Sequence, residues 1–373
     1  MKVIAYYLPQ FHCIPENDEM WGEGFTEWTN VKNAKPLFKG HNQPRIPSGD
    51  NYYNLLENDV KVWQVDLARK YGIYGFCFYH YWFNGKQLLE KPVIQFLENK
   101  DLDIHFCLSW ANEPWTKAWV SKNDKVLYEQ KYGEKKEWME HFEYLLPYFL
   151  DERYITREGK PLLVIYRPEQ IECLNDMLDY WVQLAKENGL LGIAFAFQHI
   201  DFEYAKNYDD SRFEYNIEYE PLYALDSLNS KKKKMVRILK ILDDVSFNLT
   251  NHKLSEYYLK VRKMDYDTVW KSCIESGPRS KKSIGGAFVD WDNTPRRSNK
   301  GVTYTGANPI KFEKYFKEKI LKIKKEYEIN DMVFVFSWNE WAEGGYLEPD
   351  KKNEYKYLEA IKRVLYKYDN EEK

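Results

Sequence analysis

Glu340 and Glu343 are the two side chains in this sequence whose type and spacing best fit acid–base chemistry. They follow an apolar run at residues 332–336 that is typical of a buried strand, so they are expected where that strand ends. Trp338 and Trp341 flank them and would add flat apolar faces on which a sugar ring can stack. The combination predicts chemistry at a glycosidic bond. The alternative is that both glutamates are solvated residues at the start of a helix, where acidic side chains are favoured.

Breaking or exchanging a glycosidic bond needs one group that protonates the leaving oxygen and a second that stabilises or generates the nucleophile. If the strand runs into a helical turn, Glu340 and Glu343 share one face, because side chains at positions i and i+3 are neighbours there. Their environments can then keep one of them protonated. The spacing assigns neither role, and it does not decide between retention and inversion.

Short apolar runs alternate with helical periodicities along most of the chain, which is typical of a parallel sheet whose strands are joined by crossover helices. The eight expected strands are Val3 to Leu8, Tyr74 to Tyr81, Ile104 to Trp110, Pro161 to Tyr166, Ile193 to Gln198, Phe213 to Tyr219, Ile284 to Asp290 and Met332 to Trp338. Amphipathic segments are expected to form helices at 56–67, 138–149, 312–323 and 358–368. The pattern predicts a closed (β/α)8 TIM barrel, with an open doubly wound sheet as the alternative.

Two long segments interrupt this alternation. Residues 9–53 are expected to form a loop after the first strand that folds over the mouth of the barrel, because loops of that length are usually functional. Residues 222–282 are an insertion between strands six and seven, and they carry the basic run Lys231–Lys234. That run would suit peripheral contact with a membrane or an acidic partner, but a solvated face is the favoured interpretation. The whole chain, 1–373, is interpreted as one barrel domain.

The carboxyl ends of the strands form the active-site rim of a (β/α)8 barrel, so the residues expected there bear on the predicted chemistry. Ring faces, amides and carboxylates predominate among them, which suits sugar hydroxyls. The expected substrate-binding residues are Trp28, Tyr79, His80, Tyr81, Trp110, Asn112, Glu113, Gln198, Trp291, Asp292, Trp338, Asn339, Trp341 and Tyr346. His80 is equally consistent with a structural histidine inside the fold. No cluster of arginines is visible at these strand ends, so a phosphate group is not expected there.

Composition and charge exclude several classes of protein. A chain of 373 residues with 44% hydrophobic residues is not disordered, and a formal net charge of -3 argues against nucleic-acid binding. The five cysteines are scattered, which favours reduced thiols, and in the absence of CxxC and HExxH motifs no metal or other cofactor is expected. The N-terminus lacks the features of a secretory signal and no stretch is apolar enough to span a membrane, so a cytoplasmic protein is expected.

A set of motifs spread along the chain resembles one known family. The motifs are Phe25-Thr-Glu-Trp-Thr-Asn30, Gly75-Phe-Cys-Phe-Tyr-His-Tyr-Trp82, Trp110-Ala-Asn-Glu113, Arg153-Tyr-Ile155, Gly159-Lys-Pro161, Trp291-Asp-Asn-Thr-Pro-Arg-Arg297 and Trp338-Asn-Glu-Trp-Ala-Glu-Gly-Gly-Tyr-Leu-Glu-Pro349. Over nearly its whole length the sequence is similar to the WbsX-type family of bacterial surface-polysaccharide synthesis, which is described as glycoside hydrolase family 99-like. The insertion at 222–282 is its least similar part.

Family 99 enzymes are endo-acting α-mannosidases and α-mannanases on a (β/α)8 barrel that need no metal, and their WNEWxEG motif carries two catalytic glutamates. The resemblance therefore implies that Glu340 is the base that helps the 2-hydroxyl of the substrate attack the anomeric carbon, and that Glu343 is the acid on the leaving group. The reaction would be retaining and substrate-assisted. Ala342 stands where those hydrolases usually have histidine, and Gly345 and Tyr346 replace a different pair, so the motif is closer to the WbsX branch.

Three functions are compatible with these residues. The first is a family 99-like glycoside hydrolase or transglycosidase that acts on α-mannose-like linkages of a bacterial surface or capsular polysaccharide. The second is a sugar-nucleotide-dependent glycosyltransferase in O-antigen or capsule biosynthesis, in which an Asp-x-Asp pattern starting at Asp101, Asp265 or Asp290 would bind a divalent ion. The third is a carbohydrate-binding protein without catalytic activity.

Overall fold

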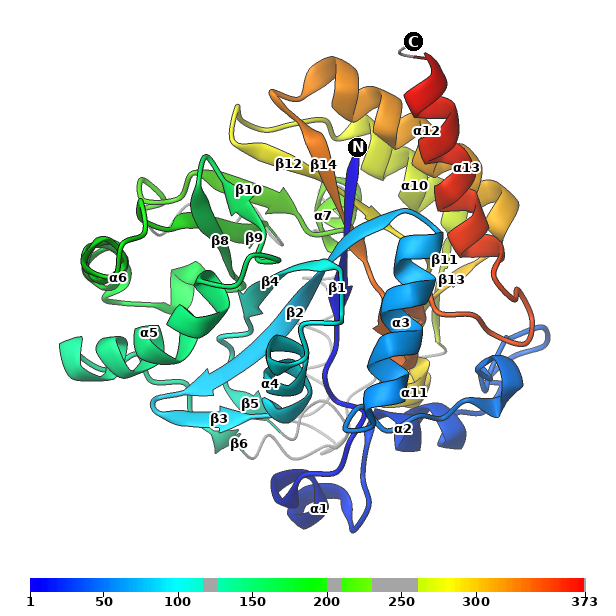
Figure 1. Ribbon diagram of the computed structural model, residues 1–373. Coiled ribbons are helices and arrows are strands. Elements are labelled where there is room, and N and C mark those ends of the chain that lie inside the picture. Colours follow the sequence, from blue (N-terminus) through cyan, green and yellow to red (C-terminus); the bar gives the residue numbers. More distant parts are fainter. Residues whose placement is uncertain (117–125, 200–208, 230–260, 372–373) are drawn as a thin grey trace, which may run out of the picture.

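The first strand closes a barrel, because it is hydrogen-bonded to both the second strand and the last. β1 (Lys2–Tyr7) pairs in parallel with β2 (Ile73–Phe83) and with β14 (Ile329–Phe336). The computed structural model describes residues 1–116, 126–199, 209–229 and 261–371, and eight parallel strands of these residues form the closed barrel (Figure 1). Between β2 and β14 the order is β4 (His105–Trp110), β8 (Lys160–Ile165), β9 (Ala194–His199), β10 (Tyr215–Glu218) and β12 (Ser283–Phe288).

The barrel strands are buried along nearly their whole length. In β14, for example, residues 332–336 are all buried. Parallel strands that are covered on both faces consist of continuous apolar runs, which explains why the strands could be identified from the sequence. Each expected strand coincides with one barrel strand, apart from small shifts at the ends. The predicted (β/α)8 TIM barrel is therefore confirmed, and the open doubly wound sheet is wrong.

Helices surround the barrel and bury one face each. They are α3 (Asn58–Lys70), α4 (Lys91–Glu98), α5 (Lys135–Phe149), α6 (Leu174–Glu187), α7 (Leu222–Asn229), α10 (Tyr266–Glu275), α12 (Pro309–Glu326) and α13 (Lys356–Glu371). In α12, Phe312, Phe316 and Ile320 are spaced four residues apart and are buried against the barrel. Asn308 caps this helix by accepting a hydrogen bond from the backbone of the first turn. The four helices expected from the sequence correspond to α3, α5, α12 and α13.

Shorter elements complete the described chain. They are β3 (Lys86–Leu88), β5 (Trp115–Thr116), β6 (Val126–Tyr128), β7 (Thr156–Arg157), η3 (Pro168–Gln170), β11 (Arg262–Asp265), α11 (Thr294–Arg297), η5 (Ser298–Lys300), β13 (Val302–Thr305), β15 (Asn339–Glu340), η6 (Trp341–Glu343) and β16 (Gly345–Tyr346). Within the described ranges, no helix has both the length and the apolar character that crossing a membrane requires.

The long segment after β1 lies at the mouth of the barrel, as the sequence predicted. It contains α1 (Pro15–Trp21), α2 (Glu27–Asn33) and the 3-10 turn η1 (Ser48–Asp50). Figure 1 shows α1 and α2 beyond the carboxyl end of β1. Because α2 packs against α11 and η6, this segment forms part of the wall around the strand ends.

The insertion between β10 and β12 contributes α7, β11 and α10 to the described structure. β11 pairs in parallel with β13, outside the barrel sheet. α7 and α10 pack against each other. The basic run Lys231–Lys234, for which peripheral contact was considered, lies outside the described residues.

Candidate active site

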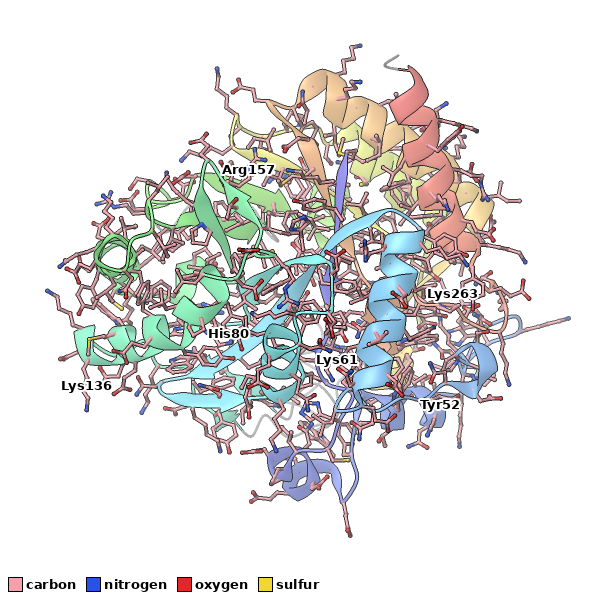
Figure 2. All side chains as sticks on the ribbon, viewed as in Figure 1. Tyr52, Lys61, His80, Lys136, Arg157 and Lys263 are labelled. Atoms are coloured by element: carbon pink, nitrogen blue, oxygen red, sulfur yellow. The ribbon has the colours of Figure 1, made fainter. Side chains whose placement is uncertain are left out.

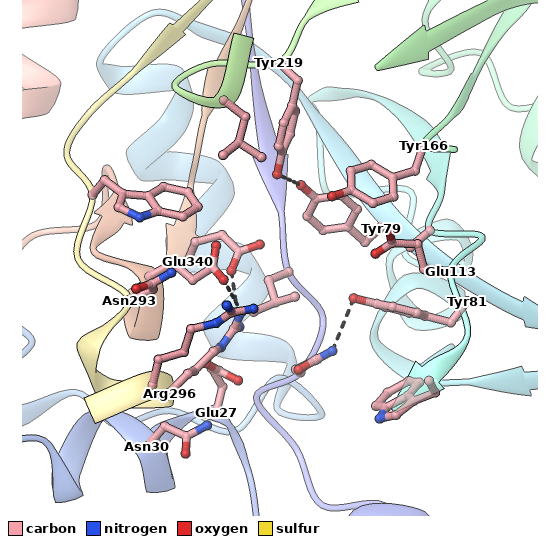
Figure 3. Close-up of a pocket in the computed structure, with 18 of the residues that line it drawn as sticks. Glu27, Asn30, Tyr79, Tyr81, Glu113, Tyr166, Tyr219, Asn293, Arg296 and Glu340 are labelled. Carbon is pink, nitrogen blue, oxygen red and sulfur yellow. Dashed lines mark hydrogen bonds and ion pairs between the residues drawn. The ribbon is translucent and has the colours of Figure 1, made fainter. Parts of the chain in front are cut away.

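A pocket of about 420 Å³ opens at the carboxyl ends of the barrel strands (Figure 3). Its lining includes residues that follow β1, β4, β8, β10, β12 and β14 within a few positions, together with the end of β2. Further lining residues come from the segment 9–53, α7, α11, β5 and the starts of β11 and β13. Catalytic residues of (β/α)8 barrels lie at this end of the fold, so the pocket is the candidate active site.

Four charged side chains meet at one wall of the pocket. The Arg296 guanidinium donates to Glu27 Oε1 from Nε at 2.8 Å and to Glu343 Oε1 from Nη1 at 2.7 Å. Its Nη2 lies 3.5 Å from Glu340 Oε2. Figure 3 shows Arg296 beside Glu340 and Glu27, across the pocket from Glu113 and Tyr81. Glu340 and Glu343 therefore share one cation and face one cavity.

The fold after β14 directs both glutamates into the pocket. The Asn339 side chain accepts a hydrogen bond from Leu8 N at 2.7 Å and donates one to Leu8 O at 3.0 Å, which ties the turn to the end of β1. Glu340 precedes the 3-10 turn η6, and Glu343 ends it. Gly344 then has a left-handed backbone, with φ of 71°, and a Cβ there would lie 2.7 Å from Asp292 N. A glycine is therefore required to reverse the chain at this point.

Burial and neighbouring charges act on Glu340 in opposite directions. Only 4% of Glu340 is exposed, and this burial raises the pKa of its carboxyl well above the usual value. The positive charge of Arg296 lowers that pKa, whereas the negative charges of Glu343 and Glu27 raise it. The net shift is upward, so burial and the two neighbouring carboxylates together favour a proton on Glu340.

Aromatic rings form the floor and sides of the pocket. Tyr79 and Tyr219 share a hydrogen bond of 2.8 Å between their hydroxyls, and Tyr166 lies beside them (Figure 3). The Tyr81 hydroxyl accepts a hydrogen bond from Gln10 Nε2 at 3.2 Å. Further rings that line the pocket are Trp21, Phe25, Phe83, Trp115 and Trp291. Rings of this kind can stack on sugar faces while their hydroxyls bond to sugar oxygens.

A further carboxylate, that of Glu113, faces the pocket from the side opposite Glu340 (Figure 3). Burial raises the pKa of Glu113, and its ion pair with Arg167 lowers it, with a net increase. Asn112 fixes the backbone of Arg167, since its side chain accepts from Arg167 N at 2.7 Å and donates to Arg167 O at 2.7 Å. The pocket therefore has acidic groups on two sides.

The structure places the residues predicted from sequence in two groups. Those that line the pocket are Glu340, Glu343, Tyr79, Tyr81, Glu113 and Trp291. Those outside its lining are Trp28, His80, Trp110, Asn112, Gln198, Asp292, Trp338, Asn339, Trp341 and Tyr346. All residues of the second group are buried in the fold.

The tryptophans next to the glutamate pair do not supply stacking faces, contrary to the expectation. Trp338 is fully buried and packs on Phe76. Trp341 stacks on Tyr346, with ring centroids 3.8 Å apart, and its Nε1 donates to Glu348 at 2.6 Å. The tight turn after β14 explains why the tryptophans do not reach the pocket. It directs Glu340 and Glu343 into the pocket and the residues between them into the core.

His80 and Trp110 also lie away from the pocket. Side chains alternate between the two faces of a strand, so His80 points toward α5 while Tyr79 and Tyr81 reach the pocket. Its Nε2 lies 2.8 Å from His141 Nε2, and Figure 2 labels it on the side of the barrel covered by α5. Burial lowers the pKa of His80 to about 3, so it is neutral. Trp110 packs against His141 in the same layer.

The remaining predicted residues make contacts inside the fold. Gln198 donates to Ser109 Oγ at 3.3 Å. Asp292 Oδ2 lies 2.8 Å from His41 Nε2, and its backbone N donates to Glu343 O at 2.7 Å. Trp28 is buried and packs on the rings beneath the pocket. The contacts of Asp292 and Trp28 fix the segment 9–53 and the turn after β14 relative to each other.

Sequence reasoning missed several residues of the pocket, above all its arginines. The expectation that no arginines cluster at the rim is wrong, because Arg262, Arg296 and Arg297 all line the pocket. They come from β11 and α11, which follow the barrel strands at some distance, and therefore were not visible at the strand ends. Arg296 does belong to one of the motifs that carried the family resemblance, and Glu27 belongs to another. Within the described ranges, no His, Cys, Asp and Glu side chains form a group of three that could bind a metal ion.

The model of the family described as Glycosyltransferase WbsX matches residues 3–361. Two curated relatives from Xanthomonas campestris pv. campestris, both named uncharacterized protein WxcX, are 34% and 33% identical over 365 residues, which is 97% of this chain. The chain spans 49% of each of these relatives, about half their length.

Two solved structures share the fold. The GH99 endo-alpha-mannosidase from Bacteroides thetaiotaomicron has a TM-score of 0.55 and 13% sequence identity, and the match covers 99% of this chain and 97% of that one. A glycoside hydrolase-like protein has a TM-score of 0.56 and 12% identity, with 97% of this chain and 93% of the other covered. At this level of identity the similarity establishes a common barrel fold.

Proposed function

The chain belongs to the WbsX glycosyltransferase family, and on this premise we propose that its pocket cleaves or transfers a glycosidic bond through Glu340 and Glu343. Family and fold together indicate a carbohydrate-active enzyme. The proposed substrate is an α-mannose-like linkage in a bacterial surface or capsular polysaccharide. The reaction is proposed to be retaining and assisted by the substrate.

One observation carries this proposal. Glu340 and Glu343 contact the same guanidinium, that of Arg296, and both face a cavity lined by aromatic rings. An acid–base pair at a glycosidic bond needs this arrangement, because both carboxyl groups must reach one sugar unit. Burial raises the pKa of Glu340, so the proposed base must lose its proton before it acts, and the positive charge of Arg296, which lowers that pKa, assists this ionisation.

In the proposed reaction Glu340 accepts the proton of the substrate's 2-hydroxyl, and that oxygen forms a bond to the anomeric carbon. The bond from the anomeric carbon to the leaving oxygen breaks, and Glu343 gives its proton to the leaving oxygen. The 2-oxygen, C2 and the anomeric carbon then form a three-membered ring. Water or a sugar hydroxyl attacks the anomeric carbon and opens this ring. Glu343 accepts the proton of the attacking hydroxyl, and Glu340 returns its proton to the 2-oxygen. The two inversions give net retention. No carboxylate forms a covalent bond to the sugar in this route.

Sugar-nucleotide-dependent transfer is the second candidate function, and the arginines of the pocket favour it. Arg262 and Arg297 line the pocket and could contact a diphosphate. The Asp-x-Asp patterns give it less support, because each contains a carboxylate in an ion pair within the protein: Asp103 with Arg69, Asp267 with Lys311 and Asp290 with Arg45. A third reading, carbohydrate binding without catalysis, predicts that the glutamates only accept hydrogen bonds.

The test is a screen of the purified chain against defined α-mannose-containing oligosaccharides, with the anomer of the first product read by NMR. Glu340→Gln and Glu343→Gln are each expected to reduce kcat by about 10²–10⁴-fold, since this is the usual contribution of a general acid or base. Glu326→Gln, at the exposed end of α12, is the matched control. Full turnover in either active-site variant would contradict the proposed roles.

Calorimetry with sugar nucleotides, with and without a divalent metal, separates the second candidate from the first. Binding of a sugar nucleotide, together with transfer to a saccharide acceptor, would favour the glycosyltransferase. If the unmodified chain binds saccharides but turns them over neither in the oligosaccharide screen nor with sugar nucleotides, the third function, carbohydrate binding without catalysis, is correct.

A further inference from the structure

Two arginines of the pocket differ from the others in having no ion-pair partner among the described residues. Arg296 contacts three carboxylates, and Arg167, at the opposite side, pairs with Glu113. Arg262 and Arg297 also line the pocket, yet both are exposed and neither forms an ion pair with a described residue. Two uncompensated guanidinium groups at the edge of a cavity are available for an anionic ligand.

The fold brings these two arginines to the same edge. Arg262 begins β11, and its N donates to Gly301 O at 3.1 Å, so it lies next to Val302 of β13. Val302 N donates to Asn293 Oδ1 at 2.8 Å, and Asn293 N donates to Val302 O at 3.1 Å. Arg297 N in turn donates to Asn293 O at 3.0 Å. One hydrogen-bonded backbone patch centred on Asn293 therefore carries both side chains, and Asn293 itself lines the pocket.

The arrangement also separates the charges of the pocket. The carboxylates of Glu27, Glu340 and Glu343 surround Arg296, while the next residue, Arg297, lines the pocket, is exposed and forms no ion pair with a described residue. Lys263, labelled in Figure 2, follows Arg262 and is exposed as well.

We propose that Arg262 and Arg297 form an oxyanion subsite at the edge of the pocket, which binds a carboxylate or phosphate group carried by the substrate. The proposal rests on the proposed function, because it takes the pocket as the saccharide site. Guanidinium groups donate paired hydrogen bonds that fit both carboxylate and phosphate oxygens. The ligand class is thus an acidic saccharide, in which the charged group lies beside the sugar that contacts Glu340 and Glu343.

The first experiment uses the full chain and does not require the sugar to be known. The arginine Nε–Hε resonances are followed by NMR during titration with inorganic phosphate and with glucuronate, against glucose and sodium chloride at equal ionic strength. Arg262→Gln and Arg297→Gln assign the two resonances. Both are expected to shift in a saturable way at millimolar phosphate or glucuronate. Arg212, an exposed arginine that pairs with Asp179, is the control and is expected not to respond.

Equal responses of Arg212 and the two pocket arginines would show unspecific ion binding, and the absence of any saturable shift would show that no subsite exists. Either result overturns the proposal. Neither result tests the proposed catalytic role of Glu340 and Glu343. That role is tested separately, by the turnover of neutral oligosaccharides and its loss in Glu343→Gln.

The second experiment identifies the source of the oxyanion. Calorimetry on the Glu340→Gln chain compares α-mannobiose, the same disaccharide with a 6-phosphate, and the same disaccharide with its C6 oxidised to a carboxylate, together with a sugar nucleotide. The charged ligand that uses the subsite is expected to bind about tenfold or more tightly than the neutral one. Arg262→Gln and Arg297→Gln should each remove most of that advantage. If the advantage of every charged ligand survives both substitutions, the arginines are not the subsite.

Discussion

Arg296 Nη1 donates a hydrogen bond to Glu343 Oε1 at 2.7 Å, and the other terminal nitrogen of the same guanidinium lies 3.5 Å from Glu340 Oε2. The side chain of Arg296 is only 8% exposed, so its charge acts on both carboxyl groups with little screening by water. A single residue on α11 thereby contacts both glutamates and lowers the pKa of Glu340. The strength of this influence can be measured.

Replacing Arg296 by glutamine should move the acidic limb of the pH–rate profile to higher pH. Burial raises the pKa of Glu340, and the charge of Arg296 lowers it, so the pKa rises further when that charge is removed. A base must be ionised to act, and more alkaline conditions would then be needed to ionise Glu340. The measurement is kcat/KM against pH. Arg296→Lys keeps a charge and should give a smaller displacement, and an unchanged profile in both variants would contradict the argument.

Replacing Glu27 by glutamine should displace the same limb in the opposite direction. Glu27 raises the pKa of Glu340 through its negative charge, so its removal lowers that pKa and lets Glu340 ionise at lower pH. Glu27 also accepts a hydrogen bond from Arg296 Nε at 2.8 Å. A displacement to higher pH in Glu27→Gln would therefore mean that holding Arg296 in place is its main effect. Comparison of the pH–rate profiles of Glu27→Gln and Arg296→Gln distinguishes the charge effect of Glu27 from its role in holding Arg296.

Aromatic rings at the pocket edge should contribute to affinity rather than to the chemical step. Trp115 lines the pocket and packs against Tyr81, with ring centroids 5.3 Å apart. Trp115→Ala is expected to raise KM by about two- to tenfold and to change kcat little, since aromatic contacts of this kind contribute about 0.5–1.5 kcal/mol. Trp63→Ala, on α3 and outside the pocket lining, is the matched control. A fall in kcat with unchanged KM would assign Trp115 a different role.

The fold was predictable because every barrel strand is buried on both faces and therefore appears as an apolar run. The site was predictable only in part. Periodicity identifies the end of a strand, but it does not tell which of two adjacent residues faces the pocket: Tyr79 and Tyr81 do, and His80 between them does not. The sharp turn after β14 had the same consequence for Trp341, which lies in the core between two glutamates that face the cavity.

The residues that could not be predicted come from segments remote from the strand ends. Arg296 lies on α11 and Glu27 on α2, and only the packing of these two helices against each other and η6 brings them to the glutamate pair. Arg262 reaches the pocket because β11 pairs with β13 outside the barrel. Contacts of this kind depend on tertiary structure. The family motifs contain Arg296 and Glu27, but the local periodicity of the sequence does not place them beside the glutamate pair.

The pair of histidines behind the pocket should make the protein sensitive to acid. His80 and His141 are buried side by side, with 2.8 Å between their Nε2 atoms, and burial lowers the pKa of His80 to about 3 and that of His141 well below its usual value. Both histidines bind protons in the unfolded chain below about pH 6.5 but not in the native state. Stability is therefore full above that pH and falls as the pH drops toward 3.

Replacing both histidines by phenylalanine should remove this dependence while keeping rings in the layer between β2 and α5. The loss of unfolding free energy between pH 7 and pH 5 is expected to be smaller in His80→Phe/His141→Phe than in the unmodified chain, by about 2 kcal/mol for each histidine. Chemical denaturation at the two pH values measures it. Tyr144→Phe, whose ring stacks on His80, is the control for altered packing and should leave the difference unchanged. If the double variant loses as much stability in acid as the unmodified chain, other groups cause the sensitivity.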